Sequence, residues 1–237
     1  MRRRALLGSA LPGSAWLGSA RLGSASLGWL GLLAAGQARS ATRFLNIVLD
    51  GDTVGVRIMN RESGVGRLSE TLRSAIGVPT RLGNTTAAER QMLQCLVGFR
   101  DGVAARFDAG ARANIIVLHA GTADMAQGRD PRRVYAAFSD YADNAHILGW
   151  KIIALTALVP PAMPAPAQAQ LRDYNGLLRA NLARADAVVE LDKAPWPVMA
   201  ADEADSAGRF DAEAAAAEPP VLLPLLIPAI RRVGSTG

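Results

Sequence analysis

The sequence is poor in the residues that build disulfides and metal sites. Among 237 residues it has one cysteine, Cys95, and two histidines, His119 and His146. One cysteine excludes a disulfide within the chain and a metal site built on thiolates. Two separated histidines argue against a site built on a histidine cluster. Cys95 falls in a helical pattern of apolar residues, which predicts a small buried side chain. We therefore expect no metal site.

Lysine is also scarce, and the excess of positive charge is confined to one end of the chain. The formal net charge of +5 comes from five arginines in residues 1–40, a stretch without acidic residues. Residues 41–237 carry 21 basic and 21 acidic side chains. Because binding to nucleic acid requires a clustered basic face, the composition gives no case for a nucleic-acid partner. Apolar residues make up 50% of the chain, enough to bury the core of one domain.

Residues 1–40 have the layout of a secretory signal. Arginines at positions 2–4 precede repeats of the type Leu-Gly-Ser-Ala, a more apolar stretch over 27–35, and small residues before a possible cleavage after Ser40. A positively charged start, an apolar middle and small residues before the cleavage site are typical of a signal peptide. We predict export to the periplasm or the extracellular space. An uncleaved membrane anchor is the second alternative, and a low-complexity tail on a cytosolic protein is the third. The chain thus divides into a leader, residues 1–40, and one domain, residues 41–237.

Short apolar runs alternate with amphipathic segments from residue 44 onward. This alternation predicts an α/β fold with a mainly parallel, five-stranded sheet and helices on both faces. Strands are expected near residues 44–49, 80–82, 114–119, 151–156 and 187–191. Helices are expected near residues 65–76, 85–107, 131–148, 167–183 and 221–233. The second helix would be capped by Thr85 or Thr86, and the last would kink or break at Pro224 and Pro228.

Three of these strands end in glycine followed by polar residues. The three ends are Gly51-Asp52-Thr53, Gly83-Asn84 and Gly121-Thr122-Ala123-Asp124. In parallel sheets, ligands bind at the carboxyl ends of the strands, so we predict a site where the three turns converge. The hydroxyl of Thr53 lies where a nucleophile would sit, with a helix-capping role as the alternative.

With these motifs in this order, the chain resembles the SGNH, or GDSL-type, hydrolases over nearly all of residues 44–233. The first turn corresponds to the family's Gly-Asp-Ser, Gly83 to the glycine of its second block, and residues 121–124 to its Gly-Thr-Asn-Asp. The stretch after Phe210 corresponds to the family's Asp-x-x-His. The resemblance implies a flavodoxin-like three-layer α/β/α sandwich that hydrolyses acyl or acetyl esters, or thioesters, without a cofactor.

The chain departs from the family at three catalytic positions. Thr53 replaces the nucleophilic serine, Ala123 the oxyanion-hole asparagine, and Ala214 the histidine. Asp211, at the position that orients the histidine, remains. Loss of one oxyanion donor typically lowers a rate about 100- to 1,000-fold. The resemblance therefore implies lost or strongly reduced ester hydrolysis, and a cleft that could still bind a small acyl or acetylated-sugar ligand.

Two other interpretations stay open. The chain could be a non-catalytic binding or scaffold module, or a working hydrolase in which another base serves Thr53. His119 and Glu213 are the candidate bases, and His119 is otherwise a structural or polar lining residue. The expected cleft residues are Gly51, Asp52, Gly83, Asn84, Gly121, Asp124 and His119.

Other residues near the motifs have structural interpretations. We expect Asp52 and Asp124 to hold their loops through backbone hydrogen bonds, and His146 to cap a helix or lie at the surface. The substrate depends on loops such as residues 160–166 and 192–205, and the sequence specifies neither the substrate nor the oligomeric state.

Overall fold

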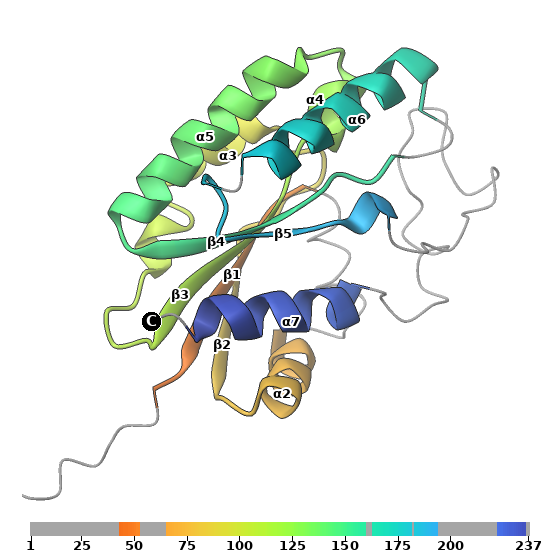
Figure 1. Cartoon of the computed structure of the whole chain (residues 1–237). Helices are drawn as coiled ribbons and strands as arrows, with labels where there is room; N and C mark the ends of the chain where they lie inside the picture. The colour runs from red at the N-terminus through yellow and green to blue at the C-terminus, as the bar shows by residue number, and fades with distance from the viewer. Residues whose placement is uncertain (1–42, 53–64, 160–162, 182, 194–221, 236–237) are drawn as a thin grey trace, which may run out of the picture. The chain divides into compact units, whose positions relative to one another are not determined.

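The computed structural model describes residues 43–52, 65–159, 163–181, 183–193 and 222–235. Within these ranges the chain forms a five-stranded sheet whose neighbouring strands are all parallel, in the order β2-β1-β3-β4-β5 (Figure 1). The strands are β1 (Leu45–Gly51), β2 (Thr80–Asn84), β3 (Ala113–His119), β4 (Trp150–Leu155) and β5 (Ala187–Val189). The helices are α2 (Val65–Ile76), α3 (Met92–Gly98), α4 (Thr122–Ala126), α5 (Pro131–Ile147), α6 (Ala165–Ala180) and α7 (Leu222–Gly234), with short 3₁₀ turns at 104–106 and 191–193.

The central strands are β1 and β3, and their apolar composition follows from their position. Every residue of both strands is buried, because helices cover both faces of the sheet. The register places Leu45 opposite Ala113 at the amino ends and Gly51 opposite His119 at the carboxyl ends. The two polar turns that follow these strands therefore begin side by side.

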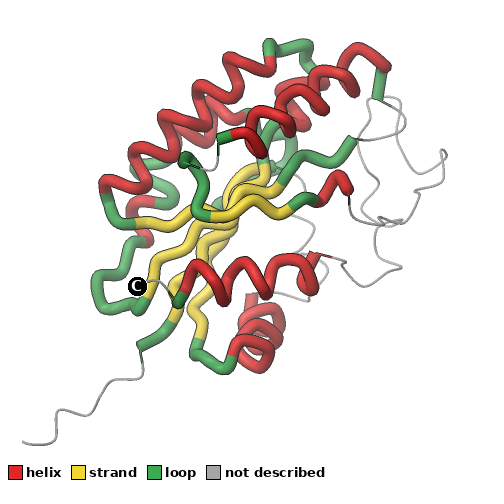
Figure 2. Tube along the Cα trace, in the orientation of Figure 1, coloured by secondary structure: helices red, strands yellow, loops and turns green. Residues whose placement is uncertain are grey.

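Helices cover the sheet in two layers. Helices α3, α4, α5 and α6 lie on one face, and α2 and α7 lie on the other (Figures 1 and 2). The first layer packs residues such as Met92, Phe138 and Leu171 against the sheet, and the second packs Leu72 and Ile230. This is the three-layer α/β/α sandwich with a parallel sheet that the sequence predicts, so the predicted fold is confirmed.

One predicted helix, over residues 85–107, is wrong. The segment instead contains α3, only seven residues long, and a separate 3₁₀ turn at 104–106. Thr85 caps no helix, since its hydroxyl donates to the carboxylate of Asp50. Thr86 donates both its N–H and its hydroxyl to the side chain of Asn84. Such side-chain hydrogen bonds compete with helix formation, and α3 starts only at Met92, after the N-cap residue Gln91, which forms a capping box with Gln94.

Two further differences concern α4 and α7. The short helix α4 was not predicted and starts directly after Gly121. The sequence predicts a kink or a break at Pro224 and Pro228; the structure shows no break, since α7 spans both prolines. Pro224 lies in the first turn, where no N–H is needed, and both prolines are exposed while the opposite face of the helix is buried. Packing of that face offsets the hydrogen bond lost at Pro228.

The leader, residues 1–40, lies outside the described residues. Among the helices that the structure does describe, none combines the length and the apolar character needed to cross a bilayer.

Candidate active site

Three strands bring their polar ends to one edge of the sheet. Asn84 ends β2 and pairs with Leu49 of β1, while Gly51 pairs with His119, the last residue of β3. Helix α4 then follows β3 after two residues. The turns after Gly51, Gly83 and His119 therefore lie on neighbouring strands, as the sequence predicts. Four residues singled out from the sequence lie outside the described ranges, namely Thr53, Asp211, Glu213 and Ala214.

Gly51 fixes the geometry of the first turn. Its φ of +113° is a conformation that residues with a side chain rarely adopt. A Cβ atom here would lie 1.7 Å from the carbonyl oxygen of His119. That oxygen accepts the N–H of Asp52 at 2.8 Å. Only glycine therefore allows β1 to turn this closely against the end of β3.

The same turn brings together two ionisable side chains. Oδ1 of Asp52 is hydrogen-bonded to Nδ1 of His119. The exposed fractions of the two side chains are 1% and 2%. The sequence singled out both residues, but it gave no reason to pair them, because the contact depends on the register between β1 and β3.

The turn after β3 is held by a buried carboxylate. Oδ2 of Asp124 accepts the N–H of Met92, the first residue of α3, at 2.9 Å. Burial raises the pKa of Asp124 above its usual range, against the effect of this hydrogen bond. Gly121 has a φ of +116°, and a Cβ atom there would lie 2.6 Å from the ring of Tyr174. Ala123 is half-buried in this turn and has no side-chain donor.

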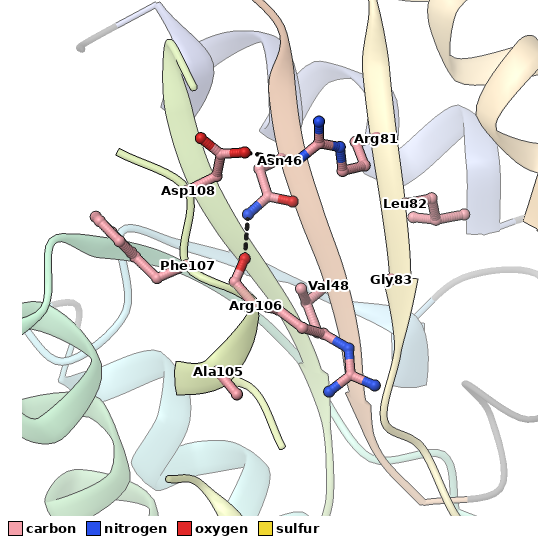
Figure 3. A pocket seen from close by; sticks show the side chains of 9 residues that line it. All are labelled: Asn46, Val48, Arg81, Leu82, Gly83, Ala105, Arg106, Phe107 and Asp108. Carbon is pink, nitrogen blue, oxygen red and sulfur yellow. Dashed lines mark hydrogen bonds and ion pairs between the residues drawn. The ribbon is translucent and has the colours of Figure 1, made fainter. Parts of the chain in front are cut away.

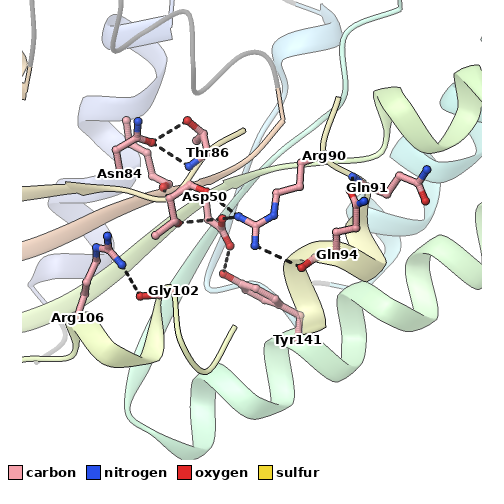
Figure 4. Close-up of polar contacts among 11 residues, drawn as sticks. Asp50, Asn84, Thr86, Arg90, Gln91, Gln94, Gly102, Arg106 and Tyr141 are labelled. Carbon is pink, nitrogen blue, oxygen red and sulfur yellow. Dashed lines mark hydrogen bonds and ion pairs between the residues drawn. The ribbon is translucent and has the colours of Figure 1, made fainter. Parts of the chain in front are cut away.

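At the end of β2, the carboxamide of Asn84 has one fixed orientation. Its Oδ1 accepts the backbone N–H of Thr86 at 3.0 Å and the Thr86 hydroxyl at 2.7 Å (Figure 4). Since a backbone N–H can only donate, the oxygen must face Thr86 and the NH₂ group must face away. Among the described residues, nothing accepts a hydrogen bond from this NH₂ group.

A buried polar network behind the site was not predicted from the sequence. Asp50, 1% exposed, accepts hydrogen bonds from Thr85 Oγ1 at 2.9 Å, Arg90 Nη1 at 2.8 Å and the Tyr141 hydroxyl at 2.8 Å (Figure 4). Arg90 also donates to the carbonyl oxygen of Thr85 at 2.6 Å. The network therefore ties the loop after β2 to β1 and to α5. An acidic residue directly before Gly51, inside an apolar run, was the only signal for it.

Further along the edge, Asn175 of α6 holds the chain after β4. Its side chain accepts the N–H of Ala157 and donates to the carbonyl oxygen of the same residue, both at 2.8 Å. Asp192, after β5, accepts hydrogen bonds from Thr156 at 2.7 Å and from Arg179. These residues support the edge of the sheet from the side of β4 and β5.

His146 lies away from these turns, in the last turn of α5. It is 33% exposed and contacts Asp186 at 3.1 Å, which agrees with the expected surface position. Within the described ranges, no group of three or more His, Cys, Asp or Glu side chains is arranged to hold a metal ion.

A hollow of about 340 Å³ lies beside the edge strand β2. It is bordered by β1, β2 and residues 105–108 (Figure 3). Arg81 on its rim contacts Asp108 at 2.5 Å, and Arg106 donates to the carbonyl oxygen of Gly102. Of the residues in the predicted site, only Gly83 borders this hollow.

No family model matches this chain, and no curated protein matches it in sequence. Solved structures do match. TesA is 16% identical and superposes with a TM-score of 0.58 over 79% of this chain and 99% of TesA. A putative acylhydrolase from Bacteroides fragilis is 15% identical, with a TM-score of 0.54 over 89% of this chain and 99% of the other. The SGNH-hydrolase family esterase AlinE4 is 16% identical, with a TM-score of 0.51 over 82% and 96% of the two chains. The described part of this chain therefore has the fold of the SGNH, or G-D-S-L, hydrolases.

Proposed function

We propose that this chain is a divergent SGNH-type hydrolase that cleaves small acyl or acetyl esters at a strongly reduced rate. The observation that carries the proposal is the convergence of Gly51-Asp52, Asn84 and the turn over 121–124 at one edge of the sheet. Thr53 follows Asp52 directly in the sequence, and its hydroxyl is the proposed nucleophile. The matching structures that are named as esterases and acylhydrolases support the same class of reaction.

The reduced rate follows from the oxyanion hole. Ester hydrolysis passes through a tetrahedral intermediate whose negative oxygen must be held by hydrogen-bond donors. Ala123 supplies no side-chain donor in the turn that starts α4. The NH₂ group of Asn84, oriented by Thr86, is available as a hydrogen-bond donor at the carboxyl end of β2, the strand next to β1. We propose that it supplies part of the lost stabilisation.

The test is hydrolysis of an activated acetyl ester by the full chain, beside its Thr53→Ala and Ala123→Asn variants. We expect slow hydrolysis by the parent, a fall to background for Thr53→Ala, and an increase of about tenfold or more for Ala123→Asn, since one oxyanion donor is typically worth 100- to 1,000-fold. A parent rate equal to buffer, unchanged by Ala123→Asn, would contradict the proposal.

A non-catalytic binding module is the second candidate, and the hollow beside β2 favours it because, of the motif turns, only Gly83 borders this hollow. In that case Thr53→Ala would change neither hydrolysis nor ligand affinity. Equilibrium binding of small acetylated sugars to the parent, to Thr53→Ala and to Arg106→Ala separates the two candidates. Binding that depends on Arg106 alone would favour the module.

We also propose that the chain is exported and that its leader is removed near Ser40. The charged start, apolar middle and small-residue exit of residues 1–40 support this. Determining the amino-terminal residue of the chain recovered outside the cytoplasm tests it, and a chain that retains its leader in the cytoplasm would contradict it.

A further inference from the structure

The side chains of Asp52 and His119 form a buried pair, and a backbone hydrogen bond between the same two residues fixes their positions. Both side chains are almost fully inaccessible to solvent. The N–H of Asp52 donates to the carbonyl oxygen of His119 at 2.8 Å. Asp52 is therefore bonded to His119 through both its backbone and its side chain. Gly51 makes this approach possible, since no other residue fits against His119. The imidazole therefore has little freedom to turn.

This contact determines which ring nitrogen of His119 carries the proton. A carboxylate only accepts hydrogen bonds, so Nδ1 must donate to Asp52. In the neutral ring, Nε2 then has a free lone pair. Nε2 is buried and has no hydrogen-bond partner among the described residues. Leaving a buried polar atom without a partner destabilises the fold, and such atoms in native structures call for an explanation.

The position of the pair supplies that explanation. His119 ends β3 at the carboxyl edge of the sheet, opposite Gly51, and Asp52 is the residue before Thr53 in the sequence. A carboxylate that holds Nδ1–H and leaves Nε2 as the acceptor is the arrangement of a general base in acyl transfer. The pair occurs in a chain that has alanine, Ala214, at the position of the family's histidine.

We propose that His119 is the general base of this site and that Asp52 is its positioning residue. This inference rests on the proposed ester hydrolysis. An attacking O–H, from a hydroxyl side chain or from water, gives its proton to Nε2 while its oxygen bonds to the carbonyl carbon and the C=O electron pair moves to the carbonyl oxygen. As the C=O bond re-forms, the bond to the alcohol breaks, and the leaving oxygen takes the proton from Nε2. If a hydroxyl side chain attacked, the acyl group is now on that side chain, and water releases it as the acid through the same two steps.

Burial strengthens the electrostatic contribution of Asp52 to this step. Taking up the proton turns the ring into an imidazolium ion next to a carboxylate. The attraction between opposite charges is several-fold larger in a partly buried site than in bulk water, so Asp52 stabilises the charged form of His119 where it develops. The ester oxygen gains negative charge in the same step, so the net charge of the site does not change.

The first test is spectroscopic and does not need activity. Because the chain has only two histidines, a long-range ¹H–¹⁵N spectrum of the ¹⁵N-labelled full chain near pH 7.5 resolves all four ring nitrogens. The His146→Gln variant assigns them. We expect His119 with a protonated Nδ1 and an unprotonated Nε2. A proton on Nε2, in either the other tautomer or the imidazolium ion, overturns the proposal.

The second test compares His119→Asn with His146→Gln in the acetyl-ester assay. The amide nitrogen of asparagine takes the place of Nδ1 and can still donate to Asp52, but nothing replaces Nε2. We expect His119→Asn to lose about 100-fold or more of the rate, as typical for removal of a general base, with an unchanged melting temperature. His146→Gln should keep the parent rate. If His119 only supported the fold, His119→Asn would keep the rate too.

The two proposals fail in different ways. An active parent with an equally active His119→Asn variant overturns the role of His119 alone. A parent at background overturns ester hydrolysis, and with it the role of the base. If Thr53→Ala and His119→Asn both fall to background, the attacking oxygen is the Thr53 hydroxyl. If only His119→Asn falls, it is water, and His119 is the base in either case.

Discussion

Replacing Tyr141 with phenylalanine tests the buried network around Asp50. The hydroxyl of Tyr141 donates to Oδ2 of Asp50 at 2.8 Å, and the tyrosine is fully buried on α5. Burial, together with the charge of Asp50, raises the pKa of Tyr141 well above its usual range, so at neutral pH the hydroxyl is protonated and donates. Phenylalanine fills the same space and keeps the edge-to-face contact with Phe99, so the substitution removes the hydrogen bond alone.

The expected loss follows from the charge on the acceptor. Hydrogen bonds to charged groups contribute about 1.5–3 kcal/mol to stability. For a domain of 150–250 residues, 1 kcal/mol changes the melting temperature by about 2–4 °C. Tyr141→Phe should therefore lower the free energy of unfolding by about 1.5–3 kcal/mol and the melting temperature by roughly 3–12 °C. Urea unfolding followed by circular dichroism measures the first value, and calorimetry the second.

Tyr135→Phe provides a matched control on the same helix. The hydroxyl of Tyr135 is buried and has no hydrogen-bond partner among the described residues, while its ring contacts Phe138. Removing this hydroxyl should leave stability within about 0.5 kcal/mol of the parent or raise it, since an unpaired buried polar group is unfavourable. Equal losses for Tyr141→Phe and Tyr135→Phe would refute the assignment of the stabilisation to the Asp50 hydrogen bond.

Three further predictions concern other described residues. Burial, and the nearby charge of Asp50, raise the pKa of the Cys95 thiol. At pH 8 a thiol reagent such as dithionitrobenzoate should therefore label Cys95 only after the chain unfolds. Rapid labelling of the folded chain would contradict this. Burial alone would raise the pKa of Asp192, but the hydrogen bonds from Arg179 and Thr156 outweigh it and lower this pKa. The stability that the ionised Asp192 contributes is therefore complete above about pH 4, the pKa of an unfolded aspartate, and is lost as the pH falls through the lower pKa of the folded state. Asp192→Asn should then flatten the acid side of a stability–pH curve measured by urea unfolding. Gly51→Ala should prevent native folding, because its Cβ atom would overlap the backbone of His119, and a thermally stable, fully folded variant would disprove that close approach.

The sheet and most helices were predictable because their signals are local. Buried strands such as 113–119 are near-continuous apolar runs, and the helix over residues 65–76 has the bounds that its apolar spacing predicts. The failure over residues 85–107 has a non-local cause, since Thr85 and Arg90 use their hydrogen-bonding groups on Asp50 rather than on a helix. A local pattern contains no information about such a partner.

The sequence predicts the location of the candidate site, at one edge of the sheet, but not the contacts between its side chains. The glycine-led turns after three strands identified where the polar residues gather. The pairing of Asp52 with His119, and the orientation of Asn84, depend on strand register and on a turn that only Gly51 permits. The proposed nucleophile, Thr53, and the residues around Asp211 remain predictions from the sequence.

The position of α7 determines when one face of the sheet becomes covered during synthesis of the chain. This helix is the last one described, and its buried residues, such as Ile230, pack on the sheet face that also holds Leu45 and Ile115. A Cβ atom added at Gly234 would lie 3.1 Å from the side chain of Leu45. Those strand residues are synthesised far earlier than the helix that covers them. A chain emerging from the ribosome therefore leaves part of this apolar face uncovered until α7 has been synthesised, and during that interval the uncovered part is available to chaperones.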